Sequence, residues 1–202
     1  MAILIYGSPR SRTMRVLWMA AELGLDYEHI QYEFDDPKLK HPDFLQLNPA
    51  GAVPTIVDGD FSLSESLAIN LYLAKKYNRS SLFPKSQEGE ASAIRWSLFA
   101  QGHLEPWIQK DLVLADLIKA IGGLGDGMVR QSLRVLNEVL SKSQWLVGGE
   151  FTVADLNVAG VLSPSRSDAL DLTELQNVRS WLDRCYSRPA ALECRRRYSQ
   201  PH

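Results

Sequence analysis

Cysteine is scarce in this sequence: Cys185 and Cys194 are the only two among 202 residues. Two thiols near one end of the chain cannot supply the disulfide framework of a small secreted protein or the ligand cluster of a structural metal site. We therefore expect a reduced, cytoplasmic setting and no metal ion. The sequence also has no internal repeat and no low-complexity segment.

Charge imbalance and long hydrophobic runs are lacking as well. The formal net charge of -2 argues against a protein that binds nucleic acid or another polyanion. The apolar run at residues 1–6 is shorter than the hydrophobic region of a signal peptide and has no basic start. No stretch approaches the roughly 18 uninterrupted apolar residues of a membrane span. We expect a soluble globular protein with neither a nucleic-acid nor a membrane partner.

The most informative stretch that is present covers residues 48–77. It begins with loop residues at 48–51, and Pro54 then opens an apolar run that ends at Asp58-Gly59, a strong signal for a short hairpin. After a second short strand around Phe61, small oxygen-bearing side chains at 64–66 precede a long apolar-rich segment. Such side chains are typical of a helix start, because they can accept hydrogen bonds from backbone N–H groups that lack helical partners.

The order of the expected elements divides the chain in two. In the first part, strands are predicted at residues 2–6, 27–32, 55–57 and around 61. Helices are predicted at residues 14–23 and 67–77, with a short helix or turn at 37–45. This is the order of a thioredoxin-like α/β domain. We predict such a domain over residues 1–78, a linker over 79–87 and an all-helical domain over 88–202. The first long helix of the second domain, predicted from Glu88 to about Ile121, should be kinked or interrupted at Pro106.

One acidic residue of the second domain has a structural interpretation. Thr152 is followed by Asp155 at the third helical position, a pattern close to a capping box in which aspartate replaces the usual glutamate or glutamine. We therefore expect Asp155 to cap a buried helix and to have no catalytic role.

Two binding resources lie side by side in the stretch 48–77. If the backbone of Val53 is extended and faces outward, a peptide can pair with it as an added strand. The helix start at Ser66 offers N–H groups and the positive end of the helix dipole, which suit a carboxylate. A short peptide with a free α-carboxylate would use both.

These motifs resemble a known family. The run V-P-T-I-V-D-G-D followed by E-S-L-A-I-N-L-Y-L is similar to the glutathione-binding segment of cytosolic glutathione transferases. In the second half, G-G-E-F-T-V-A-D and N-V-R-S-W-L-D-R followed by R-P-A resemble the capping-box helix and the final helices of the same family. The resemblance implies an N-terminal thioredoxin-like domain followed by an all-helical domain.

The resemblance also implies roles for individual residues. The bond before Pro54 should be cis, the backbone of Val53 should pair with the cysteinyl part of glutathione, and Glu65 with Ser66 should hold its γ-glutamyl end. Lys40 matches a basic residue that pairs with the glycyl carboxylate in several classes. Ala52 stands where many relatives carry a glutamine that contacts the ligand.

The loop after the first strand should activate the thiol of glutathione. A cysteine thiol has a reference pKa of about 8.5, and lowering it by about two units requires roughly 2.7 kcal/mol of selective thiolate stabilisation. Ser11 is the first choice for the hydroxyl donor, because a serine that follows Tyr6-Gly7 after three intervening residues resembles the serine-type transferases. The spacing to the following arginine is one residue shorter than in that pattern, so Ser8, Arg12 and Thr13 remain alternatives.

The second substrate should be a small hydrophobic electrophile. Phe99, His103 and Trp107 lie at helical spacing on the first long helix of the second domain, which the resemblance directs toward the first domain. Aromatic residues at such spacing belong to a core more often than to a pocket. One or two of these residues are expected to line the pocket for the electrophile.

Three functions fit these features. The first is a glutathione transferase that joins the thiolate to an electrophile or reduces a peroxide, with glutathione as co-substrate and no cofactor. The second is a non-catalytic glutathione-binding, ligand-binding or stress-regulatory protein of the same fold. The third is an interaction module, which the end of the chain at His202 without an appended domain disfavours. The family implies a homodimer, without the large aromatic intersubunit contact that Ala50 replaces.

Overall fold

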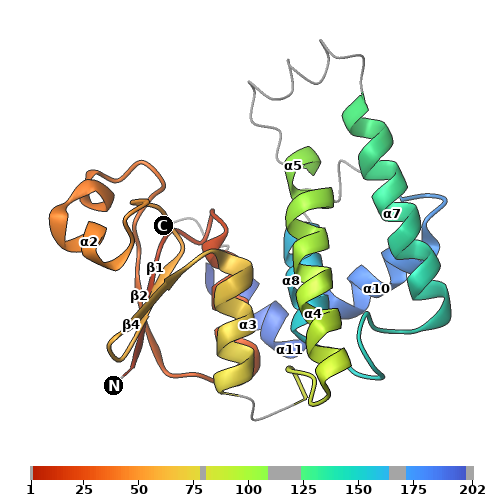
Figure 1. Cartoon of the computed structure of the whole chain (residues 1–202), viewed down its shortest axis with the longest axis horizontal. Coiled ribbons are helices and arrows are strands. Elements are labelled where there is room, and N and C mark those ends of the chain that lie inside the picture. Colours follow the sequence, from red (N-terminus) through yellow and green to blue (C-terminus); the bar gives the residue numbers. More distant parts are fainter. Residues whose placement is uncertain (1, 78–80, 109–123, 164–171, 199–202) are drawn as a thin grey trace. The chain divides into compact units, whose positions relative to one another are not determined.

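The computed structural model describes residues 2–77, 81–108, 124–163 and 172–198 (Figure 1). Packing divides the chain into two compact units. The first contains the described residues of Met1–Phe83 together with those of Ser187–His202, and the second contains those of Pro84–Tyr186. Within the described ranges, no helix is long and apolar enough to cross a membrane.

The first unit is built on a four-stranded sheet of order β2-β1-β3-β4. β1 pairs in parallel with β2, whereas β3 is antiparallel to both β1 and β4. A parallel pair needs a crossover connection, and the helix between β1 and β2 supplies it. The strands are β1 (Ile3–Tyr6), β2 (Tyr27–Ile30), β3 (Thr55–Asp58) and β4 (Phe61–Ser64).

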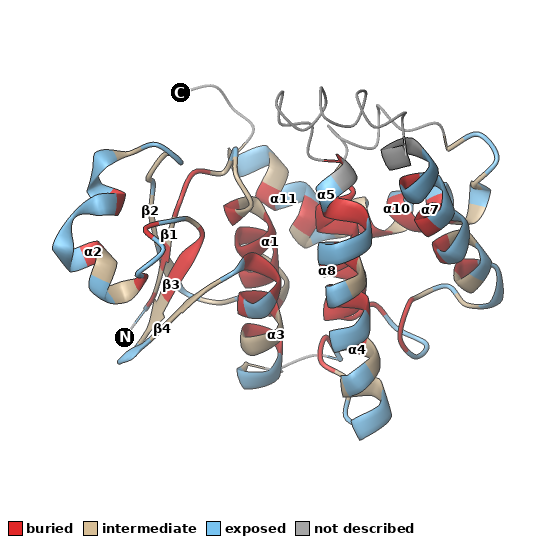
Figure 2. Cartoon of the chain, turned by 45° about the horizontal axis from the view of Figure 1, so that its top comes forward, coloured by how far each residue is buried: buried red, intermediate tan, exposed pale blue. Residues whose placement is uncertain are grey.

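Helices cover both faces of this sheet. α1 (Thr13–Leu23) and α3 (Ser66–Lys76) lie on one face, and the short segments η1 (Pro37–Lys40) and α2 (Pro42–Leu47) lie on the other (Figures 1 and 2). α1 ends where the sequence predicts, because Gly24 takes a left-handed conformation with φ of 59° and donates its N–H to carbonyls of the last turn. The thioredoxin-like α/β arrangement predicted for this part of the chain is confirmed.

The last helix of the chain, α11 (Pro189–Tyr198), also belongs to the first unit. It packs against α1. Just before its start, the guanidinium of Arg188 donates two hydrogen bonds of 2.8 Å to the carboxylate of Glu22 at the end of α1. Such a two-point contact fixes orientation as well as distance, and it joins residues that lie far apart in the sequence.

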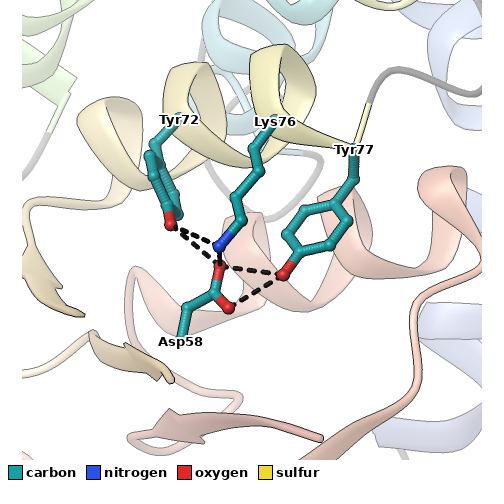
Figure 3. Close-up of polar contacts among 4 residues, drawn as sticks. All are labelled: Asp58, Tyr72, Lys76 and Tyr77. Atoms are coloured by element: carbon teal, nitrogen blue, oxygen red, sulfur yellow. Dashed lines mark hydrogen bonds and ion pairs between the residues drawn. The ribbon is translucent and has the colours of Figure 1, made fainter. Parts of the chain in front are cut away.

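The hairpin between β3 and β4 forms at the predicted turn, with Asp58 opposite Phe61 and Gly59 at a φ of 64°. Asp58 accepts hydrogen bonds from the hydroxyls of Tyr72 and Tyr77 and from Nζ of Lys76, at 2.8–2.9 Å (Figure 3). Burial alone would raise the pKa of the Asp58 carboxyl, but these hydrogen bonds and the charge of Lys76 lower it overall. The cluster ties the end of β3 to the end of α3.

The described part of the second unit contains only helices as regular structure, as predicted. They are α4 (Gln87–Phe99), η2 (Ala100–Leu104), α5 (Glu105–Ile108), α7 (Leu124–Lys142), α8 (Val153–Val161) and α10 (Gln176–Tyr186).

The predicted interruption before Pro106 takes the form of a π-helical turn. η2 is this turn, and the N–H of Glu105 bonds to the carbonyl of Ala100, five residues back. Proline has no N–H and its ring collides with the carbonyl four residues earlier in an α-helix, so a wider turn relieves the conflict. The predicted continuation of this helix to residue 121 lies outside the described residues.

α8 is buried at every position. The capping box predicted at its start is present, with Thr152 and Asp155 bonded to each other's backbone and side chain. The other carboxylate oxygen of Asp155 accepts hydrogen bonds of 2.9 Å from the N–H of Leu146 and from Nε1 of Trp181. Burial raises the pKa of Asp155, and these donors oppose that shift. The structural role expected for Asp155 is confirmed.

Candidate functional site

The loop before β3 presents an extended backbone edge. The Val53–Pro54 peptide bond is cis, as expected. The buried amide of Asn48 donates to the carbonyl of Ala52 at 2.9 Å and to the hydroxyl of Thr55 at 3.1 Å, which holds the loop on both sides of the proline. Among the described residues, the backbone N–H and C=O of Val53 have no hydrogen-bond partner. Both groups are therefore available to an added strand.

The start of α3 combines backbone strain with an exposed carboxylate. Glu65 has a φ of 68° and is the only described residue other than glycine with a positive φ. Such conformations are costly for residues with a Cβ and gather at binding sites. Glu65 is the N-cap residue of α3, but its side chain makes no capping hydrogen bond. This argues against a purely structural cap and leaves the carboxylate for a ligand.

Ser66, the first residue of α3, is buried beside a buried arginine. Its Oγ accepts a hydrogen bond of 3.2 Å from Nη1 of Arg15 on α1, and both residues are 3% exposed. Nothing in the sequence motifs assigns Arg15 to the site. The available signal was a permanently charged residue within the apolar pattern of α1, which folding tolerates only when the charge is satisfied.

The loop between β1 and α1 contains the hydroxyl candidates. Oγ of Ser11 donates to the carbonyl of Ser8 at 2.7 Å and lies 2.8 Å from the hydroxyl of Thr13. Because a serine hydroxyl carries one hydrogen, Thr13 is the donor in the second contact. Ser8 and Thr13 are 1% and 0% exposed, whereas Ser11 and Arg12 are half-buried. Ser11 is therefore the accessible hydroxyl of this loop.

Gly7 brings this loop against the cis-proline loop. It has a φ of 133°, and a Cβ added there would overlap the hydroxyl of Thr13 and lie 2.8 Å from Cβ of Val53. Only a residue without a side chain fits between them. The loop that carries Ser11 is thereby in contact with Val53 through Gly7, and Arg15 links α1 to the start of α3.

Lys40 borders the same loop from η1. Its Nζ donates to the carbonyls of Ala50 and Gly51 at 3.3 Å and 3.2 Å, and its side chain is exposed. The lysine is thus placed a few residues before Val53 by direct contact with the loop. Ala52 is exposed and offers no side-chain polar group here.

Tyr6 does not provide a thiol-activating phenolate. Its ring packs against Tyr32 and Phe44, with centroids 5.7 Å and 5.6 Å away. Burial, followed by the nearby Tyr32 and Glu28, raises the pKa of Tyr6, which is the wrong direction for an ionised catalyst. The preceding residue of β1, Ile5, is fully buried.

In the second unit, two of the three predicted pocket residues lie together. The rings of Phe99 and His103 are stacked, with centroids 5.1 Å apart. They line an open hollow of about 430 Å³ on α4 and η2, together with Ala91, Ile94, Arg95 and Leu98. Trp107 lies in α5, but its side chain is outside the described part of the structure.

In the described ranges, no three histidine, cysteine, aspartate or glutamate side chains are grouped so that they could hold a metal ion. The cysteines are both buried, and burial raises the pKa of Cys194 to about 12. Neither cysteine is thus a candidate nucleophile.

Comparisons with known proteins agree with this geometry. Residues 1–75 match the family model of the glutathione S-transferase N-terminal domain, and residues 125–189 match that of the C-terminal domain. The chain is 33% identical to glutathione S-transferase 3 of Zea mays, over 92% of this chain and 90% of the relative.

Two solved structures extend the likeness. A structure of glutathione S-transferase III in apo form is 30% identical, with a TM-score of 0.81 over 100% of this chain and 99% of that one. The glutathione transferase URE2P8 from Phanerochaete chrysosporium, solved with oxidised glutathione, is 25% identical, with a TM-score of 0.83 over 98% and 97% of the two chains.

Proposed function

Because the chain belongs to the glutathione S-transferase family, we propose that it conjugates glutathione to electrophilic compounds, with Ser11 stabilising the thiolate. The observation that carries this proposal is the contact among three segments of the first unit. Gly7 brings the loop of Ser11 into contact with Val53. Arg15 lies on α1, the helix that follows this loop, and it bonds to Ser66 at the start of α3. A thiol bound at Val53 would therefore lie close to the Ser11 hydroxyl.

The bound tripeptide uses the groups just described. Its cysteinyl backbone pairs with the N–H and C=O of Val53 as a short added strand. Its γ-glutamyl carboxylate lies at Ser66 and the start of α3, where the positive end of the helix dipole favours an anion. The exposed carboxylate of Glu65 pairs with the α-ammonium, and Lys40 pairs with the glycyl carboxylate at the far end.

Thiolate formation requires a change in one hydrogen bond. In the structure the Ser11 hydroxyl donates to the carbonyl of Ser8. On binding glutathione it turns toward the sulfur, while Thr13 continues to donate to Ser11. A hydrogen bond to an anion is worth about 1.5–3 kcal/mol, which is comparable to the roughly 2.7 kcal/mol needed for a two-unit shift of the thiol pKa.

The reaction then follows from the thiolate. The thiol proton leaves to solvent, the sulfur attacks the electrophilic carbon, and a C–S bond forms. The leaving group departs with the electron pair of the bond that breaks. A peroxide can serve as the electrophile in place of a carbon compound. In that case the sulfur attacks oxygen, an S–O bond forms to give the sulfenic acid of glutathione, the O–O bond breaks, and the other oxygen leaves as an alcohol or water after taking up a proton from solvent.

The remaining features of the function are also proposals. We propose that the electrophile is small and hydrophobic and contacts the hollow lined by Phe99 and His103. Glutathione is the co-substrate and no cofactor is required. We further propose a cytoplasmic homodimer, on the strength of family membership.

A second candidate is a protein that binds glutathione without turnover. It is favoured by the hydroxyl of Ser11 already being donated to Ser8, and by the absence of a polar side chain at Ala52. In that case Ser11 stays bonded to Ser8 and the bound thiol keeps its ordinary pKa.

Ser11→Ala separates the two candidates. We expect turnover of chlorodinitrobenzene to fall by about 10- to 100-fold, while calorimetry shows glutathione affinity within about threefold of the wild type. Ser8→Ala is the matched control, because Ser8 is buried and its carbonyl remains. A wild-type protein that binds glutathione but turns over no electrophile or peroxide would support the carrier instead.

A further inference from the structure

A histidine outside the binding site holds the first residue of the Ser11 loop. His29 lies on β2, paired with Ile5 of β1. Its Nε2 lies 2.7 Å from the carbonyl oxygen of Gly7. Because a carbonyl can only accept, Nε2 carries the hydrogen and His29 is the donor.

Both backbone polar groups of Gly7 are therefore fixed by neighbouring residues of one strand. Its N–H donates to the carbonyl of Ile30 at 2.9 Å, and its carbonyl accepts from His29. The first contact continues the pairing of β1 with β2. The second does not belong to the sheet, and it sets the plane of the peptide between Gly7 and Ser8.

The orientation of that peptide bears directly on Ser11. The carbonyl of Ser8 accepts the hydroxyl hydrogen of Ser11, and Gly7 itself is in contact with Thr13 and Val53. Rotation of the Gly7–Ser8 peptide would thus shift the acceptor that competes with the thiolate for the Ser11 hydroxyl. It would also change the fit between the two loops that meet in the site.

The C-terminal helix holds the imidazole in place. The ring of Tyr198 on α11 meets the ring of His29 edge to face, with centroids 5.2 Å apart and an interplanar angle of 87°. The hydroxyl of Tyr198 lies 3.0 Å from that of Tyr27. The guanidinium of Arg197 lies over both tyrosine rings, 5.8 Å and 5.4 Å from their centroids. An edge-to-face pair restricts the ring orientation that the hydrogen bond needs.

We propose that His29 is a positioning residue for the glutathione reaction, which acts by anchoring the Gly7 carbonyl and is oriented by Tyr198 of the last helix. This inference rests on the proposed function, because the loop that His29 anchors is the one that carries Ser11. It gives α11 a role in the active-site loop of the first unit.

The matched variants are His29→Ala and His29→Gln. The amide nitrogen of glutamine stands the same number of bonds from Cα as Nε2 of histidine and can donate to the same carbonyl. We expect kcat to fall by about 3- to 10-fold in His29→Ala, with KM for glutathione changed by less. The thiol pKa of bound glutathione should rise toward its free value, and His29→Gln should restore most of both.

Amide hydrogen exchange provides a readout without substrate. Exchange at residues 8–14 should speed up in His29→Ala and return in His29→Gln, while the strand β3 stays protected. Tyr198→Ala should act like a weaker His29→Ala, whereas Tyr198→Phe, which keeps the ring, should resemble the wild type.

The outcomes distinguish the positioning role of His29 from the proposed transferase function on which it rests. If the wild-type protein fails to bind glutathione, both fall. If Ser11→Ala loses turnover but His29→Ala matches the wild type in exchange, kcat and thiol pKa, only the positioning role is overturned. A His29→Gln variant as impaired as His29→Ala would also overturn it, because the loss would then not depend on the hydrogen bond.

Discussion

The two ends of the β3 and α3 pair differ in how far their polar groups are hydrogen-bonded. At one end lie Val53, with no hydrogen-bond partner for its backbone among the described residues, and Glu65, with a strained backbone and no capping bond. At the other end the carboxylate of Asp58 receives hydrogen bonds from Tyr72, Lys76 and Tyr77 (Figure 3).

This difference supports the proposal that glutathione binds at the end with Val53 and Glu65. Polar groups that satisfy one another stabilise a fold, whereas strained or unpaired groups persist where a ligand completes them. The same two elements thus carry a closed, stabilising cluster and an open site, separated by the length of β3. Changes at the open end should affect activity, whatever they do to stability, whereas changes at the closed end should affect stability and leave activity intact.

The largest effect is expected at Gly7, at the open end. Gly7→Ala should lower the free energy of unfolding by at least about 2 kcal/mol and abolish most turnover, because the new methyl group overlaps Thr13 and crowds Val53. Denaturant unfolding and kinetics measure the two effects.

Gly59→Ala at the closed end is the matched control. Gly59 also has a positive φ, of 64°, but a Cβ there meets no atom within 4 Å. It should lower stability by only about 1 kcal/mol and leave turnover intact. Equal losses of activity in the two variants would contradict the division between the ends.

Asp58→Asn tests whether the closed end contributes to stability but not to activity. It should lower the free energy of unfolding by about 1–2 kcal/mol, because hydrogen bonds to a charged acceptor are replaced by weaker ones, and kcat should stay unchanged. Asp60→Asn, at an exposed position of the same turn, should change neither. A loss of turnover in Asp58→Asn without loss of stability would show that the closed end takes part in the reaction.

The same cluster predicts a dependence on acid. The folded pKa of Asp58 lies below its ordinary value of 3.8, so the ionised form favours the folded state. Its contribution is complete above that value and is lost as the pH falls through the lowered folded pKa. The stability difference between the wild type and Asp58→Asn should therefore be present at about pH 7 and shrink below about pH 4. A difference that stays constant in acid would argue against ionised Asp58 as its source.

The smallest effect is expected at Thr13, again at the open end. Thr13→Val keeps the shape but removes the hydroxyl that donates to Ser11, and should lower kcat by about two- to fivefold. Thr13→Ser keeps the hydroxyl and should retain more of the activity. If the valine variant were as active as the wild type, the Thr13 contact would have no part in holding Ser11.

The features that the sequence predicted best depend on neighbouring residues. The turn at Asp58-Gly59, the helix end at Gly24 and the capping box of Thr152 and Asp155 each rest on backbone chemistry within a few positions. The break before Pro106 follows for the same reason, although its π-helical form was not foreseen. The cis bond before Pro54 came from family resemblance rather than from local chemistry.

The features that could not be predicted from the sequence are contacts between residues far apart in the chain. The bond from Arg15 to Ser66 and that from His29 to Gly7 span 51 and 22 positions, and no periodicity marks either pair. The packing of α11 on α1 was likewise not predicted, because an amphipathic helix does not specify which apolar surface it covers. The proposal of Ser11 over Ser8 and Thr13 rests on their burial, which spacing does not provide.

The most direct test of the account is the thiol pKa of glutathione bound to the protein, measured from the ultraviolet absorbance of the thiolate as the pH is varied. In the wild type we predict a value about two units below the reference of about 8.5, and in Ser11→Ala a return most of the way to that reference. A bound thiol with the same pKa in both proteins, or one that titrates like free glutathione in the wild type, would contradict the claim that this site holds the sulfur as an anion through Ser11.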